Sequence, residues 1–278
     1  MSVISENLLE PDTTKRNGSV RLRGIALPNE HGSWNILFEP LVAAIAVAYS
    51  PSAIWIALLF IGAFLMRQPL RIWLADRNAG RDLPQTAAAR KYTAIYSTIF
   101  AAGLAGTIAF VPTSSLLPLV IAAPLCVVQI YYDVRRKSRA LLPELTGAVA
   151  LSSSVAVISL AGGWTMPAAA ALWAIFILRL IPSILYIRSR LRLEKGKIAS
   201  SAGPVGAHVI ALLVGAYLVF FGFSPVMPVV MFGLLLGRAA LGLSPYRKKR
   251  KAMQFGIFEV IFGTLMVVSV AVGYQLHM

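Results

Sequence analysis

Acidic and basic side chains gather at the entry of the first long apolar stretch, where they could move protons or orient a substrate. Glu30 and His31 are adjacent, Asn35 follows one helical turn later, and Glu39 lies one further turn inside. A carboxylate beside an imidazole suits acid–base chemistry. Glu30 could instead cap a helix, but an acid drawn toward hydrocarbon usually faces a partner or a wet cavity. We treat Glu30, His31 and Glu39 as candidate catalytic groups and Asn35 as a candidate substrate contact.

Two arginines at the end of the second apolar segment form another candidate site. Arg67 and Arg71 are one helical turn apart, so a helix would present both guanidinium groups on one face, where they suit a phosphate or a carboxylate. Snorkelling to lipid headgroups is the alternative interpretation. Pro69 between them is expected to bend or break the turn. Asp76, shortly after, is the fourth candidate catalytic residue.

The remaining candidate substrate contacts border later apolar stretches. They are Tyr132, Asp133, Arg135, Glu144, Arg179 and Arg188. Arg179 lies about two helical turns deeper than Arg188, and an arginine at membrane depth is a functional candidate by default. The run Arg135–Arg139 is better explained as a topology signal than as a binding site, because four cations in five residues are typical of a cytoplasmic loop. Arg238 and Glu259 are expected to meet at similar depth as a structural ion pair.

The composition excludes a soluble protein. The chain is 58% hydrophobic and only 13% charged, with a mean hydropathy of +0.73. Its net charge of +15 lies beside apolar segments, so the expected partner is the anionic inner leaflet of a membrane and not nucleic acid. No cysteine or histidine cluster has metal-binding spacing, so we predict no metal site and assign no cofactor.

Uncharged segments define the elements that must position these residues. Five stretches lack Lys, Arg, Asp and Glu: 40–66, 92–132, 145–178, 198–237 and 260–278. Because one crossing needs about 20 apolar residues, each of the first four predicts a pair of helices and the last predicts one. The nine expected spans lie near 34–49, 53–73, 92–110, 115–132, 143–161, 167–187, 205–222, 225–241 and 255–274.

The basic residues determine the predicted orientation. All 26 Lys and Arg residues fall on one side of this nine-span map, which is therefore the cytoplasmic side. We expect a cytoplasmic N-terminal tail over residues 1–30, a transmembrane domain over 31–278, and multiple passes through a bacterial cytoplasmic (inner) membrane. The outer turns are short, so any chemistry belongs to a polar cavity that faces the cytoplasm.

The layout resembles the UbiA superfamily of intramembrane prenyltransferases over nearly the whole chain. The local likenesses are Gly32-Ser33-Trp34, Asp76-Arg77, the run Tyr132–Lys137, and Gly196-Lys197. The element from Glu30-His31-Gly32 to Trp34, which follows a proline, more particularly resembles the YwiC-like membrane protein family. The resemblance implies an all-α, nine-helix UbiA-like bundle.

The resemblance also implies a magnesium-bound allylic diphosphate, which this sequence does not match. UbiA enzymes hold the metal through acidic runs after spans 2 and 6. Aligning Asp76 with the middle aspartate leaves Ile72, Trp73 and Gly80 at the other ligand positions, and Glu194 is the only acid after span 6. Magnesium prefers oxygen ligands. If an anionic headgroup binds here, arginine must therefore do much of what magnesium does in UbiA enzymes. The expected donors are Arg67, Arg71, Arg179 and Arg188.

These observations favour a lipid-linked transferase of isoprenoid or quinone metabolism, with a long apolar substrate lying between the spans. A relative that has lost the ancestral chemistry is also consistent with the sequence. The competing class is a small-molecule transporter or permease. The sequence shows neither the internal repeat nor the paired interrupted helices that are typical of many transporters.

Overall fold

The structure is a computed structural model that describes residues 22–28 and 31–276. All regular structure in these residues is helical, which confirms the all-α class. The helices are α1 (Leu22–Ala26), α2 (His31–Val47), α3 (Ala53–Asn78), α4 (Pro84–Phe110), the 3-10 helix η1 (Thr113–Leu116), α5 (Leu117–Val134), α6 (Leu141–Ala161), α7 (Met166–Glu194), α8 (Ala202–Phe220), α9 (Met227–Leu243) and α10 (Ala252–Leu276).

The predicted spans correspond in order to helices α2 to α10. Seven of these helices are long and apolar enough to cross a membrane, and the two shorter ones are α2 and α9, with 17 residues each. Each short helix carries one member of a buried charge cluster, Glu39 on α2 and Arg238 on α9. The chain is thus an integral, multi-pass membrane protein.

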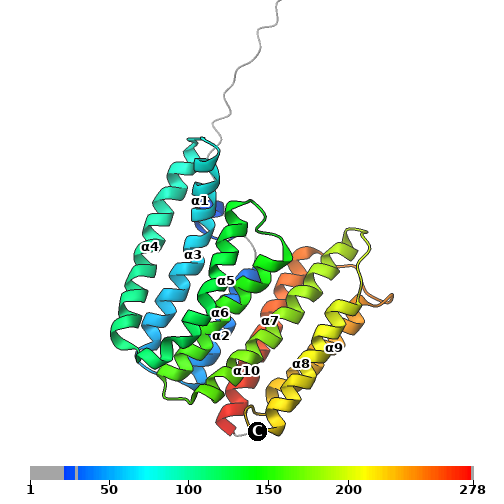
Figure 1. Cartoon of the computed structure of the whole chain (residues 1–278). Helices are drawn as coiled ribbons and strands as arrows, with labels where there is room; N and C mark the ends of the chain where they lie inside the picture. Colours follow the sequence, from blue (N-terminus) through cyan, green and yellow to red (C-terminus); the bar gives the residue numbers. More distant parts are fainter. Residues whose placement is uncertain (1–21, 29–30, 277–278) are drawn as a thin grey trace, which may run out of the picture.

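Figure 1 shows the hairpin arrangement that the charge pattern predicted. The loops that follow α3, α5, α7 and α9 lie at one end of the bundle, and they carry Arg81, Arg135–Arg139, Lys195–Lys197 and Arg247–Lys251. The short connections after α2, α4, α6 and α8 lie at the opposite end, near the end of α10. Because the positive-inside rule applies to loops, we refer to the cation-rich end as the predicted cytoplasmic end.

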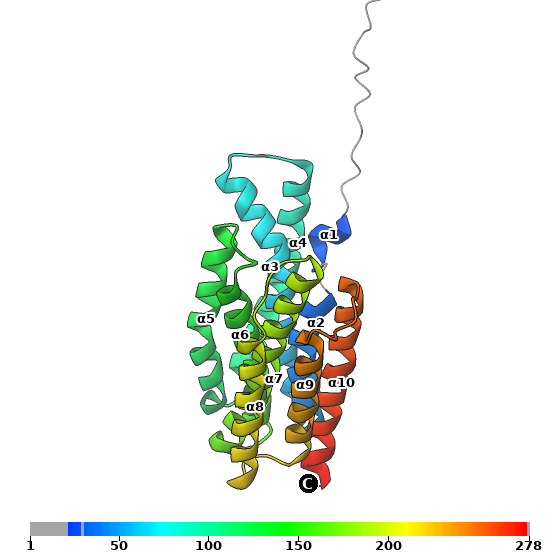
Figure 2. The same cartoon turned by 90° about the vertical axis from the view of Figure 1, so that its right-hand side faces the viewer.

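Several helices extend further toward that end than predicted. α3 continues to Asn78 and α4 begins at Pro84, so the α3–α4 hairpin projects beyond the rest of the bundle (Figure 2). At 27 residues, α4 is roughly 40 Å long, more than the ~30 Å hydrocarbon core. α3 also runs unbroken through Pro69, so the prediction that Pro69 could break it is wrong. The length of an uncharged stretch indicates which part of a helix lies in the hydrocarbon, but it does not determine where the helix ends outside the membrane.

Close backbone contact explains why α3 and α4 stay paired. A Cβ atom at Gly103 would lie 2.7 Å from the Leu58 carbonyl carbon and the Leu59 Cα, and one at Gly62 would lie 2.5 Å from the Phe100 backbone nitrogen. Helices in lipid gain little from apolar burial, so small residues that let backbones approach drive their association. These two glycines make the α3–α4 hairpin a rigid unit.

α6 occupies the centre of the bundle. Its most apolar window is 67% buried, against 17% for the segment Thr113–Val134 that contains α5. It packs against α2, α3, α5 and α7, while α10 covers the other side of α2. The core joins these helices through buried apolar side chains such as Leu37, Val155, Phe176 and Met266. This packing brings α2, α7 and α10 together around the site described below.

A short helix departs from the predicted polar tail. α1 packs on α3 and α4, its residues Ile25 and Ala26 are buried, and Gln68 Nε2 donates to the Gly24 carbonyl at 3.2 Å. The apolar side chains at Leu22 and Ile25 are three residues apart, which is a helical spacing that our sequence analysis overlooked. Residues 1–21 lie outside the described residues.

Candidate functional site

The candidate residues do not converge on one cavity. Glu39 and Arg179 meet inside the bundle, whereas Arg67, Arg71 and Asp133 lie at the predicted cytoplasmic ends of α3 and α5. The remaining described candidates are spread over five helices and one loop: Asn35 on α2, Asp76 on α3, Tyr132 on α5, Arg135 directly after α5, Glu144 on α6 and Arg188 on α7. Glu30 lies outside the described residues, and the His31 side chain is not described either, although His31 begins α2.

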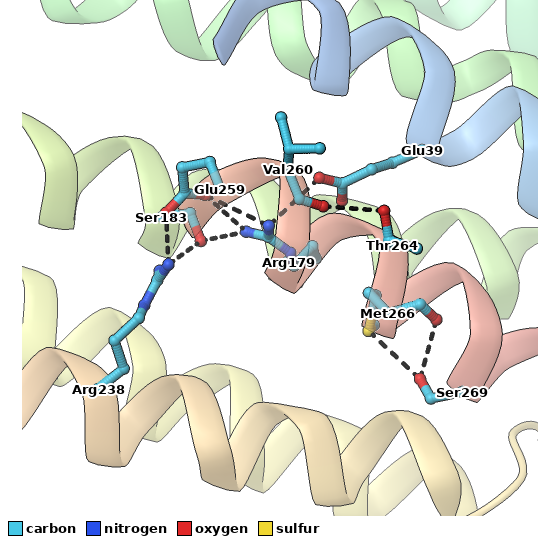
Figure 3. Close-up of polar contacts among 9 residues, drawn as sticks. All are labelled: Glu39, Arg179, Ser183, Arg238, Glu259, Val260, Thr264, Met266 and Ser269. Atoms are coloured by element: carbon cyan, nitrogen blue, oxygen red, sulfur yellow. Dashed lines mark hydrogen bonds and ion pairs between the residues drawn. The ribbon is translucent and has the colours of Figure 1, made fainter. Parts of the chain in front are cut away.

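An intramembrane ionic network links four helices (Figure 3). It consists of Glu39 on α2, Arg179 and Ser183 on α7, Arg238 on α9, and Glu259 on α10. Arg179 Nη2 donates to Glu39 Oε1 at 3.2 Å and to Glu259 Oε2 at 3.3 Å. Arg238 Nη1 donates to Glu259 Oε1, and both arginines donate to Ser183 Oγ. Two carboxylates thus balance two guanidinium groups.

The central pair of this network is deeply buried. The Arg179 side chain is 1% exposed and that of Glu39 is 5% exposed. An unpaired charge in such a position costs several kcal/mol, so the groups must neutralise one another. The predicted Arg238–Glu259 ion pair is present, and Glu39 faces a charged partner, as its depth suggested. Ser183 was missed, although its i, i+4 relation to Arg179 was readable from the sequence.

The surrounding residues shape the space for these charges. A Cβ atom at Gly263 would overlap the Glu39 carboxyl group, so this glycine lets the carboxyl lie directly on the α10 backbone. The Arg238 guanidinium lies 4.6 Å from the Tyr186 ring centroid and 4.7 Å from that of Phe262. Aromatic faces stabilise a cation without adding a formal charge. The network is therefore enclosed by α10 and by aromatic side chains.

Arg67 and Arg71 bind different partners. Arg67 forms a two-point ion pair with Asp133 on α5, with bonds of 2.8 and 3.1 Å. Arg71 donates to Ser138 Oγ at 2.7 Å and to Gln68 Oε1 at 2.9 Å. A carboxylate therefore satisfies the charge of Arg67, whereas the contacts of Arg71 are to neutral groups. The predicted shared anion site does not form from these two side chains.

The loop between α5 and α6 forms a basic recess at the predicted cytoplasmic end. It is bonded to α3 through Arg71–Ser138 and through Arg136 Nη2 to the Ala75 carbonyl at 3.0 Å, and to α7 through Arg188 Nη1 to the Arg139 carbonyl at 3.1 Å. We name the resulting hollow of about 520 Å³ the α5–α6 recess. Its lining residues are Arg71, Arg136, Lys137, Ser138, Arg139 and Ala140. The lining contains four cations and no acid.

Two of the candidate acids serve helix-to-helix contacts. Asp76 is buried and accepts hydrogen bonds from Thr86 Oγ1 at 2.8 Å and from Gln85 Nε2 at 3.2 Å, which joins the end of α3 to the start of α4. Glu144 pairs with Arg188 at 2.6 Å between α6 and α7. Neither carboxylate lines the α5–α6 recess.

Three further candidate contacts lie apart from both clusters. The Arg135 guanidinium stacks over the Tyr131 ring at 4.4 Å, and Tyr132 is half-buried beside it in the chain. Asn35 is one turn from Glu39 on α2, and its Nδ2 is buried without a hydrogen-bond partner among the described residues. Of these three residues, Asn35 is thus the one nearest in the chain to a member of the ionic network.

Arg190 is a buried cation near the end of α7 that the sequence analysis did not single out. Its side chain is 2% exposed, Nη2 donates to the Lys248 carbonyl at 2.5 Å, and Nη1 pairs with Glu194 at 2.5 Å. Its guanidinium also lies 5.3 Å from the Phe255 ring centroid. Arg190 therefore ties the end of α7 to the loop between α9 and α10.

We expect Arg190→Gln to loosen the α9–α10 loop, because the shorter amide cannot hold the Lys248 carbonyl and leaves Glu194 without its ion pair. Trypsin cleavage within Arg247–Lys251 should become several-fold faster in the purified protein. Arg192→Gln, at an exposed position on the same helix, is the matched control. Equal cleavage rates for the two variants would contradict this role of Arg190.

The described residues contain no group of three His, Cys, Asp or Glu side chains that could hold a metal ion. Glu39 and Glu144 are paired with arginines, and Asp76 is bound to a hydroxyl and an amide group.

Comparison with known proteins supports one of the two resemblances. The family model described as YwiC-like protein matches residues 27–159, which include helices α2 to α5 and nearly all of α6. No curated protein and no solved structure matches the chain. The YwiC-like resemblance is thus confirmed over this region, whereas the UbiA resemblance stays a prediction.

Proposed function

We propose that the chain binds an anionic lipid-linked substrate at the α5–α6 recess. The chain is an integral membrane protein whose residues 27–159 match the YwiC-like family model. The observation that carries this proposal is a basic recess with no acidic lining residue at one end of an apolar helical bundle. Its volume of about 520 Å³ lies in the range of ligand sites, ~300–1,000 Å³.

Arg71 is the principal anion contact in this proposal. Arg67, Arg179 and Arg188 are each paired with a carboxylate, whereas the hydrogen bonds of Arg71 within the described part of the chain go to the neutral side chains of Ser138 and Gln68. Its charge can therefore attract an incoming phosphate, which guanidinium groups bind through paired hydrogen bonds. Arg136, bonded to a neutral carbonyl on α3, is the second contact.

Apolar side chains beside the recess support an amphipathic ligand. Val134 ends α5, and Leu141 and Leu142 begin α6; they are 37%, 38% and 49% exposed. These residues flank the basic loop on its membrane side, where a polyprenyl or quinone-like chain would enter the bilayer. Exposed apolar residues are ordinary on lipid-facing helices. These three support the proposal because they lie next to the cations in the chain.

The reaction class that we propose is transfer to or from such a lipid, with arginine replacing much of what magnesium does in UbiA enzymes. Neither Glu39 nor Asp76 lines the recess: Glu39 belongs to the ionic network, and Asp76 is bound to Thr86. The proposal therefore assigns substrate binding to the recess and assigns no catalytic base.

Replacing Arg71 and Arg136 together by leucine tests the binding site. We expect affinity for a polyprenyl phosphate in nanodiscs to fall roughly tenfold or more, because each charge-assisted hydrogen bond contributes about 1.5–3 kcal/mol. Lipid mass spectrometry of the gently purified protein should show the copurified anionic lipid lost in parallel. Arg192→Leu is the control, and unchanged affinity in the double variant would rule out the recess.

Transport is the second candidate function, and the ionic network is the observation that favours it. Intramembrane ionisable residues often mark proton or ion paths. Substrate flux across proteoliposomes, without chemical change of a lipid, would favour transport over transfer.

A further inference from the structure

Glu39 occupies the end of the ionic network and has the fewest contacts of its charged members. Glu259 accepts hydrogen bonds from both arginines, whereas Glu39 accepts only from Arg179, at 3.2 Å. Glu39 Oε2 is buried and has no hydrogen-bond partner among the described residues. A buried polar atom without a partner requires an explanation, such as a ligand that completes it.

The packing around Glu39 limits that ligand to a very small one. A Cβ atom at Gly263 would overlap the carboxyl group, so the group lies against the α10 backbone. The arginines of the network exclude a metal cation by repulsion. A proton requires no added volume and carries the charge that a carboxylate accepts.

The charged groups around Glu39 allow both of its protonation states. It faces Arg179 on α7 and Glu259 on α10, with Arg238 on α9 one step further and His208 on α8 beyond the Tyr186 ring. Two other helices packed on α2, α3 and α6, hold no ionisable residue over 54–66 and 145–161. Beyond these stretches, Arg67 on α3 is paired with Asp133, and Glu144 on α6 with Arg188.

With Glu39 ionised, the network is neutral. With Glu39 protonated, Glu259 and Ser183 still hold both arginines, and Tyr186 and Phe262 still flank Arg238. The network therefore keeps its connections in either state. Asn35, one turn toward the predicted cytoplasmic end, offers a polar step on the same helix.

We propose that Glu39 is a reversible proton-binding site inside the membrane. One proton from water at the predicted cytoplasmic end adds to a carboxylate oxygen, which forms a carboxylic acid and raises the charge of the network by one. Release of that proton restores the ion pair with Arg179. This inference is independent of the lipid-binding recess, and it could serve a transferase or a transporter.

Infrared difference spectroscopy of the full chain in lipid bilayers provides the test. On mild acidification, we expect the carbonyl band of one buried carboxylic acid, distinct from the bands of solvent-exposed Asp and Glu side chains, and we expect it to disappear again on return to alkaline buffer. Glu39→Gln should abolish the band and Glu39→Asp should shift it. Glu144→Gln, which changes a carboxylate at the start of α6, should leave it unchanged.

Glu39→Gln should also fold, because a neutral amide resembles the protonated acid in shape. Should that variant fail to assemble, the band shift in Glu39→Asp decides the assignment by itself. Absence of a reversible band in the wild-type protein would overturn the proposal, as would a band that neither substitution alters.

Discussion

Arg179→Leu is expected to be among the most destabilising single substitutions in this protein. It removes the cation that both Glu39 and Glu259 contact, and it leaves Glu39 with no charged partner in a buried position. Breaking a buried ion pair by removing one partner typically costs about 3–5 kcal/mol. We expect a large fall in the detergent-resistant folded fraction, measured by size-exclusion chromatography and thermal unfolding.

The matched control is Arg192→Leu, which changes the same residue type on the same helix at an exposed position. This variant should unfold close to the wild-type temperature. Arg179→Leu combined with Glu39→Gln should recover part of the loss, because it removes the one carboxylate charge that no longer has a counter-ion, while Arg238 still pairs with Glu259. Equal stability of the two single arginine variants would show that the network contributes little to folding.

Gly103→Val is expected to separate α3 from α4. Its side chain would collide with the α3 backbone at Leu58 and Leu59, with contacts of 2.7 Å already at Cβ. Overpacking usually costs about 1–3 kcal/mol, and here the obstruction is backbone, which cannot rotate away as a side chain can. The loss of stability should be measured by denaturant titration of the protein in mixed micelles.

Gly233→Val on α9 provides the control, since nothing lies within 4 Å of a Cβ atom at that position. Both variants introduce the same side chain into a helix, so propensity effects are matched. A similar loss of stability in both would mean that the close α3–α4 approach is not what makes Gly103 important.

The sequence determined the number, order and approximate position of the membrane helices. Hydrocarbon excludes charge, so uncharged stretches mark the spans wherever the rest of the chain packs. The pairing of Arg238 with Glu259 was predictable for a related reason, because adjacent antiparallel helices place their ends at matching depth. The helix ends in water were less predictable, as α3, α4 and α7 show.

Only the tertiary structure decided which charges meet. Arg179 and Glu39 are 140 residues apart in the chain, and their contact depends on α6, which packs against both α2 and α7 and brings the two helices near each other. Helical spacing correctly placed Arg67 and Arg71 one turn apart, but it could not show that Asp133 takes one of them and Ser138 the other. The depth of a residue in the membrane follows from the composition of its own segment. Which charged residue it pairs with depends on how each helix is rotated and which helices lie beside it, and packing across the whole bundle sets both.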